Sequence, residues 1–235
     1  MIMPSADNST KHFVVKELTR LWAPLEQAHI QALKDRMTIR KYRKNDIIYK
    51  DSELPDHLLC LVKGKVKIYK EGISKRPQIL RVLKPIEFFA YRAYFAQEDY
   101  KTAGMAFEDT TIAMIPMELV VTIMKSNYNL SLFFINKLST ALGYADKRTL
   151  NLTQKHTRGR LAEALLFLED IYGLNENRIL NIRLSREDLA NLSNMTTSNA
   201  IRTLSAFANE HIISVDGRTI CFLNEEELRR ISELG

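Results

Sequence analysis

The side chains best suited to reading a nucleic acid lie together near residue 200. Thr196-Thr197-Ser198-Asn199 begins a predicted helix, and Arg202 follows one turn later. Asparagine can pair through two hydrogen bonds with adenine, and arginine with guanine, when the start of a helix enters the major groove. Hydroxyl and backbone N–H groups at a helix start also hold phosphates. This segment therefore predicts a helix that contacts base edges and the DNA backbone.

Another predicted helix precedes it. Ser185 is a suitable N-cap, with Asp188 three positions later, and the small Ala190 lies where two helices could cross. Ser193-Asn194 can end this helix, because Asn tolerates positive φ. The apolar positions of the second helix are Ala200, Ile201, Leu204 and Phe207. Two helices joined by so tight a turn predict a helix-turn-helix.

A predicted hairpin follows the two helices. Ile212–Val215 and Thr219–Phe222 flank Asp216-Gly217, a pair typical of tight hairpin turns, and such a hairpin is a wing. Arg186 begins the first helix and Arg218 lies at the hairpin tip, so both are expected to hold the DNA backbone. The alternative is a helical hairpin that contacts another protein, but the wing and the polar helix start favour double-stranded DNA.

A long helix is predicted upstream, from Leu130 to Leu152. Its apolar positions follow a 3-4-3-4-3 spacing, which suits pairing with an identical helix in a homodimer. The alternative is a helix packed on its own domain. The expected interface residues are Ile135, Leu138, Leu142, Ala145, Thr149 and Leu152.

Short helices are predicted over residues 12–37, and from about Met37 the apolar period changes to two. Many short strands at close spacing indicate a small barrel, roll or sandwich. The expected strands are Asp46–Tyr49, Leu58–Val62, Lys65–Tyr69, Gln78–Leu83 and Thr110–Ile115. Between the long helix and the helix-turn-helix, Arg158–Tyr172 predicts a helix that Gly173 ends, and Ile179–Leu184 predicts a strand.

Charge is unevenly distributed along the 235 residues. All 17 Lys lie at or before Lys155, so residues 1–156 carry 25 basic and 16 acidic side chains. Residues 157–235 carry 9 Arg and 12 acidic side chains, so the predicted DNA-binding segment is not basic as a whole. The prediction of DNA binding therefore depends on the motif and on the placement of single arginines.

The remaining composition limits the class of protein. Two isolated cysteines, Cys60 and Cys221, cannot hold an iron–sulfur cluster or a cysteine-rich zinc site, so no metal site is predicted. No apolar run reaches the roughly 18 residues that a membrane span needs, and the N-terminus lacks the apolar core of a signal peptide. We therefore expect a cytoplasmic protein without a membrane partner. No catalytic grouping is recognisable, so we expect no enzyme.

Three segments resemble the CRP/FNR family of bacterial regulators, and the resemblance covers nearly the whole chain. They are Leu61–Val66, Arg158–Ala162 and Leu184–Gly217. The resemblance implies an α+β fold with an N-terminal β-roll, similar to a cyclic nucleotide-binding domain, over residues 1–128. It also implies a dimerisation helix and hinge over 129–156 and a winged helix-turn-helix over 157–235. RNA polymerase would be a further partner if the protein activates transcription.

The effector site expected from the resemblance differs from that of cyclic-AMP-binding members. Those members have Gly-Glu after the roll's Phe, where this chain has Ala90-Tyr91-Arg92. Their phosphate-binding Arg-Ser corresponds to Lys101-Thr102, and their adenine-contacting Thr-Ser to Ala145-Asp146. Ala90 would crowd the phosphate and Tyr91 cannot accept the ribose hydroxyl as a carboxylate does. These replacements argue against cyclic AMP, so the effector is unknown.

Other sensor branches leave two alternatives open. The cysteine set of the iron–sulfur branch is absent, whereas a haem-based gas or redox sensor would need ligands such as His12, His29, His57 or His156. The other alternative is a small-molecule-binding roll that regulates a protein partner. The helix-turn-helix favours the DNA-binding regulator. Thr197-Ser198 replaces an Arg-Glu pair common in the family's recognition helix, so the DNA target is expected to differ from the family's common half-site.

Overall fold

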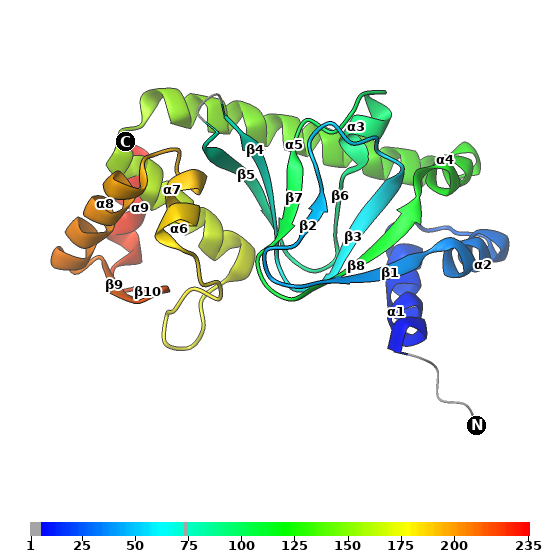
Figure 1. The fold of residues 1–235 in the computed structure, drawn as a ribbon, viewed down its shortest axis with the longest axis horizontal. Coiled ribbons are helices and arrows are strands. Elements are labelled where there is room, and N and C mark those ends of the chain that lie inside the picture. Colours follow the sequence, from blue (N-terminus) through cyan, green and yellow to red (C-terminus); the bar gives the residue numbers. More distant parts are fainter. Residues whose placement is uncertain (1–5, 73–74) are drawn as a thin grey trace. The chain divides into compact units, whose positions relative to one another are not determined.

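The computed structural model describes residues 6–72 and 75–235 (Figure 1). It divides into two compact units, and the helix α5 (Tyr128–Gln154) contributes to both. The first unit holds residues up to Lys70 and Arg81–Gly143, and the second holds Glu71–Leu80 and Tyr144–Gly235. Each unit has apolar side chains with little or no exposure, which is the main source of folding free energy.

The first unit begins with the helices α1 (Ala6–Leu21) and α2 (Gln27–Arg36). Trp22, just after α1, has no exposed surface, and its ring contacts Phe88, Phe133 and Phe134. The amide of Asn127 donates to the carbonyls of Trp22 and Pro24 at 2.7 and 2.8 Å. These contacts fix the N-terminal helices to the body of the unit.

Among the residues that the structure describes, eight strands of the first part of the chain form two four-stranded sheets. One sheet has the order β1 (Thr38–Tyr42), β8 (Thr110–Pro116), β3 (His57–Lys63) and β6 (Glu87–Phe89). The other has the order β2 (Ile47–Tyr49), β7 (Ala103–Ala106), β4 (Val66–Glu71) and β5 (Pro77–Leu83). The recorded pairings in both sheets are antiparallel, as in the roll that the sequence predicts.

One short helix lies between β6 and β7 of the roll, and two further helices come directly after β8. They are the short α3 (Tyr91–Phe95), α4 (Met117–Ser126) and the long α5 (Tyr128–Gln154). Leu130 and Phe134 of α5 are fully buried against the first unit. The early part of this helix therefore packs on its own domain. As an alternative to a dimer helix, the sequence left open that the whole helix packs in this way.

The second unit is a small helical domain with a hairpin. Its elements are α6 (Thr157–Tyr172), α7 (Arg186–Leu192), α8 (Thr197–Asn209), β9 (Ile213–Asp216), β10 (Thr219–Phe222) and α9 (Glu225–Leu234). Gly173, with φ of +70°, ends α6 as predicted. Leu161, Leu165 and Phe207 have no exposed surface and lie in the interior of this domain.

The predicted strands match the roll with shifts of one or two residues at their ends, apart from one error. Ile179–Leu184 is not a strand, because only single bridges form, from Ile179 to Cys221 and from Leu180 to Leu174. The elements β1, α3, β6, β7 and α9 were not predicted from the sequence. Of these, β6 and β7 have only three and four residues, which is too short for an alternating pattern to stand out.

Candidate nucleic-acid interface

The two helices of the motif begin at side-chain caps. The hydroxyl of Ser185 accepts from the backbone N–H of Asp188 at 2.9 Å, and that of Thr196 accepts from Asn199 at 3.2 Å. Each cap satisfies an N–H group that the first turn of a helix leaves unpaired. The caps therefore determine where α7 and α8 begin. The start of α8 in turn determines where its exposed polar side chains lie.

The turn between the helices is tightly packed. Asn194 has φ of +50°, and the hydroxyl of Ser193 donates to the carbonyl of Leu189 at 2.6 Å. Ala190 and Ala200, both almost without exposure, lie on α7 and α8, which pack together. A larger side chain at either buried position would overpack the interior of this domain. The predicted helix-turn-helix is confirmed in its caps and its turn.

The exposed face of α8 carries the predicted DNA-reading residues. Thr196, Thr197, Ser198 and Arg202 are exposed, and Asn199 is half-buried. Ile201 is also 46% exposed, whereas the other apolar positions predicted for this helix, Ala200, Leu204 and Phe207, are buried. An apolar side chain on this face can contact the methyl group of thymine.

Arg202 and Asn199 form a pair on this face. The guanidinium of Arg202 donates to the side-chain oxygen of Asn199, and no ion pair of Arg202 with Glu187 or Asp188 occurs among the described residues. Two polar groups capable of base recognition are therefore held together before any ligand arrives. Both remain on the side of α8 that the domain does not bury.

Arg186 and Arg218 differ in their surroundings. Arg186 donates to the carbonyl of Gly217 at 2.8 Å and is half-buried, and its Nη1 is buried without a partner in the described structure. It joins the start of α7 to the wing. Arg218, next to Gly217 at the tip, is exposed. Of the two predicted phosphate contacts, Arg218 is the freer side chain.

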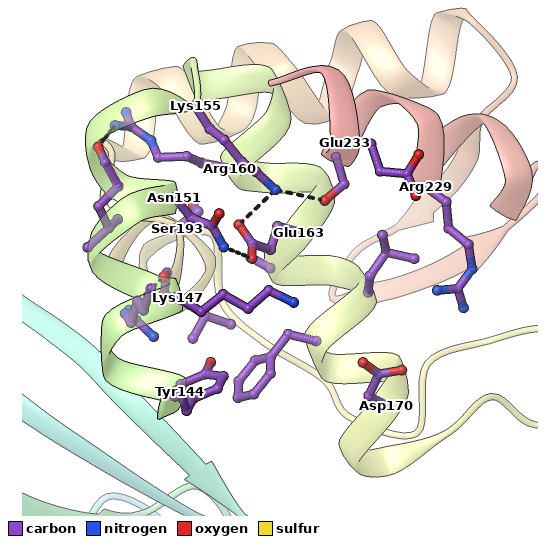
Figure 2. Close-up of a pocket in the computed structure, with 17 residues that line it drawn as sticks. Tyr144, Lys147, Asn151, Lys155, Arg160, Glu163, Asp170, Ser193, Arg229 and Glu233 are labelled. Carbon is purple, nitrogen blue, oxygen red and sulfur yellow. Dashed lines mark hydrogen bonds and ion pairs between the residues drawn. The ribbon is translucent and has the colours of Figure 1, made fainter. Parts of the chain in front are cut away.

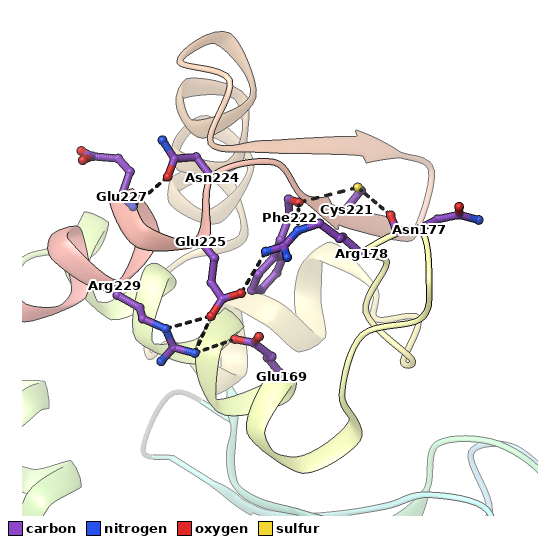
Figure 3. A network of polar contacts seen from close by, with 9 residues as sticks. All are labelled: Glu169, Asn177, Arg178, Cys221, Phe222, Asn224, Glu225, Glu227 and Arg229. Carbon is purple, nitrogen blue, oxygen red and sulfur yellow. Dashed lines mark hydrogen bonds and ion pairs between the residues drawn. The ribbon is translucent and has the colours of Figure 1, made fainter.

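A network of polar contacts lies next to the wing (Figure 3). Arg178 donates to the carbonyl of Phe222 at 3.0 Å and to Glu225 at 2.9 Å. Arg229 contacts Glu225 at 2.7 Å and Glu169 of α6 at 3.3 Å. The hydrogen bond from Arg229 lowers the pKa of Glu225, whereas burial raises that of Glu169. The network connects β10, α9 and α6.

The end of α5 is anchored in the second unit around a cavity of about 570 Å³ (Figure 2). Tyr144 stacks on Phe167 of α6, with ring centroids 5.6 Å apart. Lys155 contacts Glu163 at 3.3 Å and Ser232 of α9 at 3.4 Å. In addition, Arg148 donates to the carbonyl of Leu192, at the end of α7, at 3.1 Å. A movement of this end of α5 would therefore displace α7, the first helix of the helix-turn-helix.

The predicted interface face of α5 is largely uncovered. Ile135 and Leu142 are 57% and 64% exposed, and Ala145 and Thr149 are exposed as well. Leu138 packs partly on the roll core, and Leu152 lines the cavity at the end of α5. Tyr128 and Leu132, missed from the sequence, extend the exposed stripe at 72% and 42% exposure.

The predicted effector residues have varied positions. Ala90 has φ of +69°, and Tyr91 is buried with its ring 5.2 Å from that of Phe134. Burial raises the pKa of Tyr91. Arg92 pairs with Glu98 at 2.8 Å, and Lys101 is exposed. Ala145 and Asp146 are exposed on the part of α5 that belongs to the second unit.

Aromatic side chains fill the interior of the roll, which the sequence did not predict. The ring of Tyr49 lies 4.4 Å from that of Tyr100 and 6.3 Å from that of Phe89. Its hydroxyl is 3.1 Å from that of Thr102, and burial raises its pKa to about 12. A Cβ at Gly104 would lie 2.5 Å from the Tyr49 ring. Glycine at position 104 is what gives this ring its room.

The described residues, 6–72 and 75–235, contain no group of three or more His, Cys, Asp or Glu side chains placed to hold a metal ion. None of the helices there is both long and apolar enough to cross a bilayer. Of the histidines named as nominal haem ligands, His57 contacts Asp56 at 2.6 Å.

Comparison with known proteins gives relatives along most of the chain. The CRP-like cAMP-activated global transcriptional regulator of Mycobacterium tuberculosis is 20% identical, over 88% of this chain and 93% of that protein. The HTH-type transcriptional regulator ArcR of Staphylococcus haemolyticus is 25% identical, over 74% of this chain and 79% of that protein. The solved structure of FixK2 from Bradyrhizobium japonicum has the same fold, with a TM-score of 0.75, 22% identity and coverage of 83% and 96%.

Two protein-family models match the chain in the same order as its domains. The family model of the cyclic nucleotide-binding domain matches residues 39–127, which contain the roll. That of the Crp-like helix-turn-helix domain matches residues 159–231, from α6 into α9. With a roll, a long helix and a helix-turn-helix in this order, the chain belongs to the CRP/FNR family of DNA-binding transcription regulators.

Proposed function

We propose that the chain is a homodimeric regulator that reads two DNA half-sites, one with α8 of each subunit. The observation that carries this proposal is the pair formed by the exposed Arg202 and the half-buried Asn199 at the start of a capped, closely packed α8. Its donors and acceptors suit the edges of adenine and guanine in the major groove. Arg218 would contact the backbone from the wing.

The dimer would form through the exposed stripe of α5. Tyr128, Leu132, Ile135 and Leu142 are large apolar side chains facing solvent, and pairing with an identical helix would remove them from water. Because the end of α5 is anchored to α6, α7 and α9, the geometry of the pair would set the spacing of the two recognition helices. Two half-sites about one helical turn apart would then be read together.

A signal at the roll would act by changing the packing of α5. The aromatic filling around Tyr49 and the position of Tyr91 in the core argue for an effector other than cyclic AMP. Activation by cAMP is part of the names of some relatives, and we do not extend it to this chain. We place the protein in the cytoplasm, with RNA polymerase as a partner if it activates transcription.

Selection of bound sequences from random duplexes tests this proposal. The purified protein should enrich a sequence with two-fold symmetry and shift it as a dimer. A variant with Asn199→Ala should lose the enriched sequence, whereas Asn209→Ala, a substitution at the far end of α8, should keep it. Enrichment of no sequence by the wild-type protein would refute the proposal.

A further inference from the structure

A groove lies between the two N-terminal helices, outside the roll. The helices α1 and α2 pack against each other (Figure 1), and the Nζ of Lys11 on α1 donates to the carbonyl of Lys34 on α2 at 3.2 Å. Two hollows of about 410 and 390 Å³ lie along α1. His12 and Lys34 line both hollows, so the two form one continuous groove, which we call the α1–α2 groove.

The lining of the α1–α2 groove is cationic. Its basic side chains, besides His12, are Lys11, Lys16, Arg20 and Lys34, and none of the described residues that line it is acidic. Arg20 pairs with the adjacent Glu17 at 2.9 Å. In the part of the chain that the structure describes, the three lysines form no ion pair. Such a concave, one-signed site attracts a ligand with several negative charges.

The end of α1 is joined to the start of α5. Trp22, which follows α1, is fully buried, and its ring lies 6.4 Å from that of Phe133 and 6.3 Å from that of Phe134 on α5. The amide of Asn129, also on α5, donates to the carbonyl of Ala23 at 2.8 Å. A displacement of α1 would therefore change the packing at the start of α5.

We propose that the α1–α2 groove binds a small molecule with a chain of phosphate groups, and that binding changes the packing of α5 through Trp22. Lysine ammonium groups bind phosphate oxygens as point charges, and three of them line the groove. Each hollow is within the range of small-molecule sites, roughly 300–1,000 Å³. The phosphate chain could be an inorganic polyphosphate or part of a nucleotide. This inference rests on the proposed function, because it takes α5 to set the spacing of the recognition helices.

Isothermal titration of the full chain with inorganic tripolyphosphate tests the site. It is done without magnesium at about 150 mM salt, which screens weak surface attraction. The groove variant is Lys16→Gln with Lys34→Gln. The control variant, Lys84→Gln with Lys125→Gln, makes the same change in net charge at exposed positions. A third variant, Lys101→Gln, removes the lysine predicted at the effector site of the roll. Circular dichroism shows whether all three fold.

We expect the wild-type protein, the control variant and the Lys101→Gln variant to bind one tripolyphosphate per subunit. The groove variant should bind at least about tenfold more weakly, because two charged contacts are lost. ATP identifies the source of the phosphates, since binding as tight as that of tripolyphosphate indicates a nucleotide and weaker binding an inorganic chain. The absence of saturable binding, equal losses in the groove and control variants, or a loss in the Lys101→Gln variant would overturn the site. Binding of an oligoglutamate peptide but not of tripolyphosphate would overturn it in favour of an acidic protein partner.

Trp22 provides the second measurement, because it is the single tryptophan of the chain. We expect saturating tripolyphosphate to shift its fluorescence and to change the dissociation constant for the selected duplex by at least about fivefold. The groove variant should show neither change, which separates this effect from competition with DNA at the helix-turn-helix. Unchanged fluorescence or unchanged duplex affinity at saturation would overturn the coupling through Trp22. Failure of the ligand-free and of the saturated protein to select any duplex would instead refute the proposed function.

Discussion

Arg202 is the single residue on which base reading depends most. It is exposed, and its partner in the structure is Asn199, not an acid of the preceding helix. We therefore predict that Arg202→Ala weakens specific binding by about 1–3 kcal/mol and relaxes the preference at one base pair of each half-site. Sequence selection with the variant measures this, beside a thermal melt that should be unchanged. A selected sequence identical to that of the wild-type protein would contradict the assignment.

Arg218 is the matched control for Arg202, since it also lies exposed in the same domain. Arg218→Ala should weaken binding to all sequences alike and reduce the salt slope by about 1, because a phosphate contact carries no sequence information. Arg186→Ala is not equivalent. It also removes the bond to Gly217 that ties α7 to the wing, so a lower melting temperature is expected in that variant only.

At the scale of elements, the contact of β2 with β7 depends on one glycine. Gly104→Ala would place a methyl group against the Tyr49 ring, which Tyr100 and Phe89 hold in place. We expect a loss of about 1–3 kcal/mol in the free energy of unfolding, as for other overpacked cores. Urea denaturation measures it. In a Tyr49→Leu background the same substitution should cost less, and an equal cost in both backgrounds would rule out this contact as the cause.

The exposed stripe of α5 gives a prediction for the dimer. Ile135→Asp with Leu142→Asp would place charges in an apolar interface, and sedimentation should then show a folded monomer that binds DNA weakly. Both residues are largely exposed in the subunit, so the fold itself should survive. The control is Asn136→Asp with Thr140→Asp, which adds the same charge at exposed positions beside the stripe. A dimer that persists in the Ile135 and Leu142 variant would locate the interface elsewhere.

The sequence predicted those elements whose signals are local. Ser185, Thr196 and the Asp216-Gly217 turn identified the helix-turn-helix and wing, because caps and tight turns depend on a few adjacent residues. The strand predicted over Ile179–Leu184 was wrong, because the backbone there forms only single β-bridges and no continuous ladder. The exposure of Ile201 was not predicted, because an apolar residue on a reading face follows no burial pattern. The contact of Tyr49 with Gly104 joins residues far apart in sequence, so no spacing rule could have found it.

For the whole molecule, the filled roll predicts the response to cyclic AMP. Tyr49, Phe89 and Tyr100 occupy its interior, and Ala90 adopts a left-handed conformation with a side chain where the family's cyclic-AMP-binding members have glycine. Isothermal titration with cyclic AMP should therefore show no saturable heat. Binding near micromolar, about −8.2 kcal/mol, would contradict the interpretation of the roll.

The central claim is that two copies of α8 read DNA together at a spacing set by α5. The most direct test is the dissociation constant for duplexes carrying two selected half-sites whose centres are moved apart one base pair at a time. We expect the tightest binding at about one helical turn and a loss of at least about tenfold when half a turn is inserted, because one recognition helix then faces the wrong side of the duplex. Affinity that does not depend on spacing, or that a single half-site matches, would contradict the claim.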